Sequence, residues 1–177
     1  MQNSGLVRRI DDLGRIVIPK EIRRTLRIRS GDAIEINKEG ENLVLKKYSP
    51  FSEFSRLIES LSNALSSTTN KDCIVTDTDK IIYSSRENVL EAGSILTSLC
   101  NKIMNERKPC VFKSNEQKIP VIYIAENVEG ITQRMFVPIV KDGDCFGLVV
   151  LSAKGGEFSK EEQRLIDYTL KVLTNNV

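Results

Sequence analysis

The sequence contains neither histidine nor tryptophan among its 177 residues. Histidine is the side chain whose unperturbed pKa lies near neutral pH, so its absence excludes Ser/His and Cys/His catalytic pairs. It also excludes metal and haem sites that need a histidine ligand. No cofactor and no metal site are therefore expected, and an enzyme is the least favoured class of function.

Cysteines are few, and no two of them have the C-x-x-C spacing of a zinc ribbon or a thioredoxin motif. Cys73 and Cys145 lie within apolar runs, which predicts buried, unreactive side chains. The surroundings of Cys100 and Cys110 leave their role open.

Long hydrophobic runs are also absent. No segment approaches the roughly 18 to 20 apolar residues that a membrane helix needs, and Met1–Gly5 lacks the layout of a signal peptide. These features predict a cytoplasmic protein without a membrane partner.

Charge and aromatic residues are unevenly distributed along the chain. Residues 1–50 hold 11 Lys and Arg against 7 Asp and Glu, whereas residues 51–177 hold 15 against 17. The first aromatic residue is Tyr48, and Ser49-Pro50 is typical of a linker. We therefore expect a basic head (1–50), a connecting amphipathic helix (51–70) and an acidic body (71–177).

The head is predicted to be a small, mainly β unit. Val- and Ile-rich segments alternate with turn residues. The pattern indicates a hairpin of Gly5–Ile10 and Arg15–Ile18, a short helix Pro19–Leu26 with Ile22 and Leu26 on its inner face, and a second hairpin of Ile34–Ile36 and Leu43–Leu45 that buries one face. With 17 apolar residues among its first 47 and no aromatic there, this unit is too small to build a stable core alone, so a second chain should complete it.

Eight basic side chains lie between residues 8 and 29, and seven of them are arginines. Arginine grips phosphate with a planar fork and reads guanine, which favours nucleic acid over the alternative of a merely solvated surface. The head has no aromatic side chain on which unpaired bases could stack, so duplex DNA is the expected partner.

Gly5–Leu26 and Leu43–Ser49 resemble the AbrB-type transition-state regulator domain. This resemblance implies a swapped-hairpin barrel dimer in which Arg8, Arg15, Arg23 and Arg24 contact DNA. Arg9, Lys20, Arg27 and Arg29 are added to the candidate contacts from charge alone.

The connecting helix is expected to start with Ser49 as N-cap and Pro50 in its first turn. Its apolar residues follow a heptad spacing that indicates an oligomerisation seam: Phe51, Phe54, Ile58, Leu61 and Leu65. The same spacing fits an amphipathic helix packed on its own domain, and periodicity leaves both alternatives open.

The body is predicted to be an α+β domain, an antiparallel sheet with helices. Expected strands are 73–76, 81–84, 110–113, 121–126, 135–140 and 145–152, with helices near 93–107 and 159–173. Ser159-x-x-Glu162 is a capping box and Asp142-Gly143 a hairpin turn. The order of elements resembles a GAF domain, which implies a small-molecule sensor or a dimerisation module.

The body carries no recognisable catalytic or metal motif. Asp77-Thr78-Asp79 resembles the start of a calcium loop, but Ile81 and Ile82 stand where a ligand and a glycine are needed. Any pocket is expected between the sheet and the 93–107 helix. Whether an unidentified small-molecule effector binds there, or no ligand at all, stays open.

The whole chain resembles sporulation regulators of endospore-forming Firmicutes. That resemblance implies a transcription factor of the forespore, associated with the nucleoid, that activates some promoters and represses others and joins barrel dimers into a tetramer through the GAF-like body. The alternatives are an antitoxin-like protein, which uses the same barrel to contact a toxin, and a ligand-sensing signalling protein.

Overall fold

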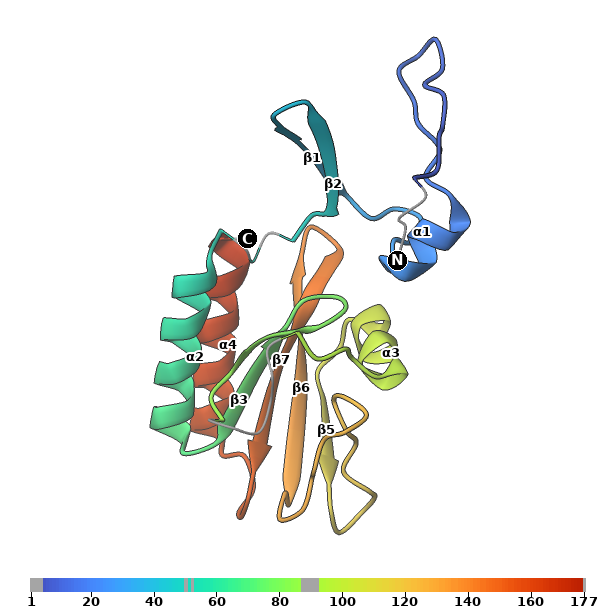
Figure 1. The fold of residues 1–177 in the computed structure, drawn as a ribbon. Helices are drawn as coiled ribbons and strands as arrows, with labels where there is room; N and C mark the ends of the chain where they lie inside the picture. Colours follow the sequence, from blue (N-terminus) through green and yellow to red (C-terminus); the bar gives the residue numbers. More distant parts are fainter. Residues whose placement is uncertain (1–4, 50, 52, 87–92, 177) are drawn as a thin grey trace. The chain divides into compact units, whose positions relative to one another are not determined.

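The computed structural model describes residues 5–49, 51, 53–86 and 93–176 (Figure 1). The chain divides into two compact units, an N-terminal unit of Met1–Tyr48 and a C-terminal unit of Ser49–Val177.

The N-terminal unit contains one short helix and one hairpin. Helix α1 (Lys20–Thr25) follows Pro19, and strands β1 (Ile34–Glu39) and β2 (Asn42–Lys47) pair in antiparallel fashion. Gly40 turns the hairpin with a φ of 62°, a conformation that favours glycine. The second predicted hairpin and the helix are thus confirmed.

The first predicted hairpin differs from the structure, because residues 5–18 form no strand. A turn is present where the sequence predicts one, closed by hydrogen bonds from the Gly14 N–H to the Asp11 carbonyl and from the Asp11 N–H to the Arg15 carbonyl. The flanking segments find no ladder partner within the described part of the chain, and extended backbone becomes a strand only when its N–H and C=O groups pair.

The predicted inner faces of this unit are exposed in the single chain. Ile22 and Leu26 of α1 are 37% and 52% exposed, and on the hairpin Ile36 and Leu43 are 62% and 66% exposed. Among the described residues of the unit only Pro19 is buried. The expectation of buried faces is therefore wrong for the single chain, whose apolar side chains lack a second layer to cover them.

The C-terminal unit is a five-stranded antiparallel sheet between helices (Figure 1). The strand order is β4-β3-β7-β6-β5. The strands are β3 (Asp72–Thr76), β4 (Ile81–Ser84), β5 (Cys110–Lys113), β6 (Gln133–Lys141) and β7 (Asp144–Ala153), and the helices are α2 (Ser55–Thr69), α3 (Ser98–Glu106) and α4 (Lys160–Asn176). The α+β prediction is confirmed.

Helices cover both faces of this sheet, which explains why its central strands are apolar without alternation. Helices α2 and α4 lie side by side on one face, and α3 covers the other (Figure 1). Alternate residues of the central strands enter different cores. Val137 and Val149 pack toward α2 and α4, whereas Phe136 and Val150 pack toward α3.

Two predicted elements have different bounds in the structure. Helix α2 begins at Ser55 with Phe54 at its N-cap position, later than the predicted cap at Ser49, and Pro50 lies outside the described residues. Residues 121–126 form no strand. Tyr123 makes one isolated bridge to Leu96, and the Ile122 carbonyl accepts a hydrogen bond from the Thr97 N–H, so this segment pairs with the start of α3 rather than with the sheet.

Two local predictions in the C-terminal unit are confirmed. Asp142 and Gly143 both have positive φ, 52° and 87°, as a two-residue hairpin turn requires. The capping box forms before α4, where the Glu162 N–H donates to Ser159 Oγ and the Ser159 N–H donates to Glu162 Oε2 at 2.7 Å.

Candidate nucleic-acid interface

The four arginines that the resemblance assigns to DNA contact all have exposed side chains: Arg8, Arg15, Arg23 and Arg24. Arg8 and Arg15 flank the Asp11–Gly14 turn. Arg15 Nε donates to Asp11 Oδ2 at 2.7 Å, and hydrogen bonds from the Arg15 backbone and side chain lower the pKa of Asp11. This exposed ion pair places the Arg15 guanidinium beside the Asp11–Gly14 turn.

Arg23 and Arg24 lie together in the last turn of α1. Cations are favoured there because the helix dipole is negative at its C-terminus. The helix then ends in a left-handed cap, since Arg27 has a φ of 56° and the Ile28 N–H donates to the Arg23 carbonyl. Arg23 and Arg24 therefore present two adjacent guanidinium groups on one helical turn, where both can bind the same partner.

The four positions added from charge alone are also exposed: Arg9, Lys20, Arg27 and Arg29. Lys20 is the first residue of α1, and Arg27 occupies the strained cap just described. The Arg29 backbone N–H donates to Asp32 Oδ2 at 2.7 Å, which shapes the turn before β1. Two of the four thus lie at positions that local backbone geometry also constrains.

The predicted seam residues are divided between two environments. Phe51, Ile58 and Leu65 are each 2% exposed and belong to the core between α2, α4 and the sheet. Phe54 and Leu61 are partly buried at the edge of the same core. The structure thus supports packing of this helix on its own unit, and only Phe54 and Leu61 keep surface for a second chain.

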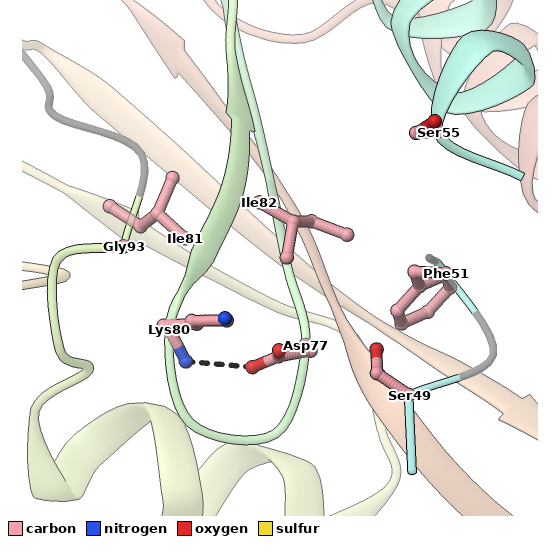
Figure 2. Close-up of a pocket in the computed structure, with 8 residues that line it drawn as sticks. All are labelled: Ser49, Phe51, Ser55, Asp77, Lys80, Ile81, Ile82 and Gly93. Carbon is pink, nitrogen blue, oxygen red and sulfur yellow. Dashed lines mark hydrogen bonds between the residues drawn. The ribbon is translucent and has the colours of Figure 1, made fainter. Parts of the chain in front are cut away.

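A pocket of about 390 Å³ lies beside the β3–β4 hairpin (Figure 2). Its apolar wall includes Phe51, Ile81 and Ile82, and its polar wall includes Asp77, whose Oδ1 accepts hydrogen bonds from the Asp79 and Lys80 N–H groups. This position differs from the one expected between the sheet and α3, because that space is filled by the side chains of the second core.

Metal ligands, reactive thiols and membrane-spanning helices would each indicate another kind of function for the described residues. Within them no three His, Cys, Asp or Glu side chains gather in a way that could hold a metal ion. Cys73 is fully buried, as predicted, and burial raises the pKa of its thiol to about 12. Cys100 is buried as well, whereas Cys110 and Cys145 are partly exposed, so burial of Cys145 is incomplete. In the described ranges no helix has the length and apolar composition to span a bilayer.

Sequence reasoning missed a buried charge network in the C-terminal unit. Arg134 and Glu126 both have fully buried side chains and form a two-pronged ion pair at 2.7 and 3.0 Å. Arg86 and Asp72 form a second pair at 2.6 Å. No spacing in the sequence brings these residues together, although a charged residue within the apolar run of β6 is a signal that it needs a buried partner.

Both parts of the chain match known families. Residues 53–177 match the family described as "Stage V sporulation protein T C-terminal, transcription factor". Residues 7–53 match the family described as "Antidote-toxin recognition MazE, bacterial antitoxin".

Similar proteins are found in Bacillus subtilis strain 168. The chain is 36% identical over 173 residues to stage V sporulation protein T, which covers 94% of this chain and 93% of that protein. It is 54% identical over 50 residues to the transition state regulatory protein AbrB, which covers 28% of this chain and 52% of that protein. The AbrB-type resemblance is therefore confirmed.

Among solved structures, the fold is similar to the GAF domain from Acinetobacter phosphoenolpyruvate-protein phosphotransferase. The TM-score is 0.59 at 12% identity, over 73% of this chain and 82% of that chain. Such low identity shows the fold alone, and it confirms the GAF-like architecture.

Proposed function

This chain belongs to the stage V sporulation protein T family, and on that premise we propose that it is a transcription regulator that binds duplex DNA through its N-terminal unit. The observation that carries the proposal is the exposed arginine set on a segment that is similar to AbrB. Four arginines, Arg8, Arg15, Arg23 and Arg24, are proposed to grip the DNA, with phosphate contacts supplying most of the affinity.

We propose further that two chains complete one DNA-binding barrel. The extended segments on either side of the Asp11–Gly14 turn carry apolar side chains that are 49% to 86% exposed: Leu6, Val7, Ile10, Leu13, Ile16 and Val17. Isolated exposed apolar residues are normal, but an entire unit without a core is not. A second copy would pair with these segments and cover both them and the apolar face of the hairpin.

The regulator is proposed to act in the cytoplasm on the nucleoid, at late, forespore-stage sporulation genes, activating some and repressing others. Transcript levels of such genes in a strain that lacks this chain test that role. Unchanged levels in sporulating cells would contradict it.

DNA binding is tested by titrating the full-length protein with a promoter-length duplex and a scrambled duplex, from low to moderate salt. Because each phosphate contact releases counterions, the salt slope counts the contacts, and the ratio of affinities measures selectivity. We expect a steep slope and tighter binding of the promoter. A flat slope, or no binding at all, would contradict the proposal.

The arginines are tested by the double variant Arg23→Ala/Arg24→Ala. We expect affinity to fall several-fold to a few hundredfold, roughly 1 to 3 kcal/mol, with the molar mass of the assembly unchanged, because both side chains are exposed. Lys108→Ala/Lys118→Ala is the matched control, since it removes the same charge from exposed positions of the C-terminal unit. Equal DNA affinities of the two variants would mean that Arg23 and Arg24 do not contact the DNA.

Larger assembly is proposed through the outer face of α2 and α4. Tyr168 and Val172, one turn apart on α4, are 68% and 42% exposed, and α4 lies beside α2, the helix that carries Leu61 (Figure 1). Charge in such a contact would be buried without a partner, so Tyr168→Glu/Val172→Glu should convert a tetramer to a dimer. Light scattering measures the molar mass, and a tetramer that persists in this variant would rule out the face.

An antitoxin-like role is the second candidate, favoured by the family match of residues 7–53. It differs in its partner, because the N-terminal unit would then bind a toxin protein. An antitoxin-like chain would need an unpacked segment with which to block its toxin. Helix α4 is not such a segment, because it packs into the core through Ile166 and Leu173. Selective promoter binding by the purified protein alone separates the two roles.

A further inference from the structure

The buried Arg134–Glu126 pair is built like an anion site. Arg134, on β6, donates from Nη2 to Glu126 Oε1 at 2.7 Å and from Nη1 to Oε2 at 3.0 Å. The Ile122 N–H donates to the same Oε2 at 2.6 Å, and Arg86 Nη1 lies 3.7 Å from Oε1. Two guanidinium groups and one backbone amide thus converge on a single carboxylate, an arrangement of charge-assisted bonds that recognises this group strongly.

Arg134 lies on a strand of the sheet, whereas Glu126 lies on an irregular segment. Arg134 is held by its Nε bond to Ser152 Oγ at 2.9 Å and its Nη1 bond to the Pro120 carbonyl at 2.6 Å. Glu126 comes from residues 114–132, which form turns and no helix or strand, and it is the only buried residue in 124–130. Between the buried Ile122 and Ile131, the side chain of Glu126 is therefore the buried contact that this stretch itself supplies.

One buried donor in the site has no partner. Arg86 is 93% buried, since its side chain is 7% exposed, and its Nε is bound to Asp72 Oδ2 at 2.6 Å. Among the residues that the structure describes, its Nη2 nevertheless makes no hydrogen bond, and a buried unpaired donor costs free energy. An additional acceptor oxygen within reach of Arg86 would remove that cost.

The balance of buried charge also favours an anion at this position. With Glu126 in place, two arginines face two carboxylates, Glu126 and Asp72. Without it, one buried positive charge is left uncompensated, which strongly favours entry of an anion.

We propose that Arg134, Arg86 and the Ile122 N–H form a binding site for a short aliphatic carboxylate, and that Glu126 competes with this ligand for the site. A carboxylate fits better than a rounder anion because the Arg134 fork already binds a planar one through two parallel bonds. An aliphatic body fits because the neighbouring side chains, Ile122 and Phe136, are apolar and fully buried. When the ligand binds, Glu126 moves out to water and residues 124–130 are released.

Propionate is the probe, because it reproduces the atoms of the glutamate side chain, and propionamide is its neutral control. Each is titrated into the full-length protein at constant ionic strength, while hydrogen exchange of residues 124–130 is followed by mass spectrometry. We expect propionate, and not propionamide or chloride, to raise exchange in this stretch in a saturable way. Arg86→Met should weaken the effect several-fold, and Lys108→Met should not.

Glu126→Ala removes the competitor. Apparent affinity equals the intrinsic affinity multiplied by the fraction of chains in which the site is open. This variant should therefore bind propionate at least about tenfold more tightly and melt at a higher temperature when propionate is added. Glu126→Gln, which keeps the shape of the side chain, serves if the alanine variant does not fold.

Two outcomes overturn the proposal. If propionate binds to the Glu126 variants but has no effect on the wild type, the Glu126 side chain never leaves the site. If no variant binds propionate in a saturable way, the site does not bind a carboxylate. All these readouts concern the C-terminal unit, so they are independent of whether the N-terminal unit binds DNA.

Discussion

Gly147 in β7 shows how closely two strands approach each other. Its conformation does not require glycine, but a Cβ at this position would lie 1.9 Å from the carbonyl oxygen of Thr76 in β3. The obstacle is backbone in a strand that β4 and β7 hold on both sides, so it cannot move aside as a flexible side chain would.

Gly147→Ala should therefore destabilise the C-terminal unit by about 3 kcal/mol, at the upper end for overpacking. Gly130→Ala is the control, because Gly130 has a φ of 76° and open space around its Cα, and should cost only about 1 to 2 kcal/mol. Urea unfolding followed by far-UV circular dichroism measures both. If the two variants are equally stable, the close contact with Thr76 is not the controlling feature.

At the scale of single residues, the sequence predicts exposure better than pairing. The arginines of α1 are exposed, as predicted, although the apolar Ile22 and Leu26 of the same helix are exposed as well. The charge network around Arg134 could not be predicted, since Glu126 comes from an irregular segment and Arg86, which also faces Glu126, from just beyond the end of β4. Such contacts depend on the packing of several elements at once, which no periodicity encodes.

The start of α4 is joined to the end of α2 by one carboxylate. Glu162 accepts the Ser159 N–H through Oε2 and pairs with Lys71 through Oε1, and the Lys71 ammonium lies 5.3 Å from the centre of the Phe158 ring. Burial raises the pKa of Glu162, but the hydrogen bonds from Lys71 and Ser159 outweigh burial and lower the pKa overall.

Glu162→Gln should therefore lower the free energy of unfolding by about 1 kcal/mol near neutral pH, as loss of a helix cap does. The folded pKa lies below the unfolded value of 4.5, so the contribution is present above pH 4.5 and is lost as pH falls through the folded pKa. Thermal unfolding of wild type and variant should converge in that acidic range. Glu161→Gln, on the same turn and exposed, should have little effect at any pH.

At the scale of helices and strands, the sequence predicts those elements whose turns or caps are determined by a few neighbouring residues. Strand pairs joined by Asp142-Gly143 or by Gly40 follow from turn geometry, and α4 follows from its capping box. The strand predicted at 121–126 was wrong because, of the apolar residues in this run, Ile122 alone is buried, while Ile124 is 93% exposed. The seam of α2 was ambiguous for a related reason, since a heptad cannot tell a neighbouring sheet from a second helix.

Across the whole molecule, the two units should differ in how they depend on concentration. The C-terminal unit has two cores of its own, whereas the N-terminal unit leaves its apolar side chains exposed. Hydrogen exchange should therefore show protection of β1 and β2 that increases with chain concentration, because the proposed pairing completes that unit, while protection of β6 and β7 stays constant. Protection of the β1–β2 hairpin that is independent of concentration would contradict the pairing.

The exposed apolar surface of the N-terminal unit also has a consequence for gene dosage. If a complete barrel needs two chains, then below the pairing concentration its amount rises with the square of the number of chains, so doubling the copy number would raise it about fourfold. Promoters that bind the barrel would then respond to the synthesis rate of the chain with a threshold, without any effector.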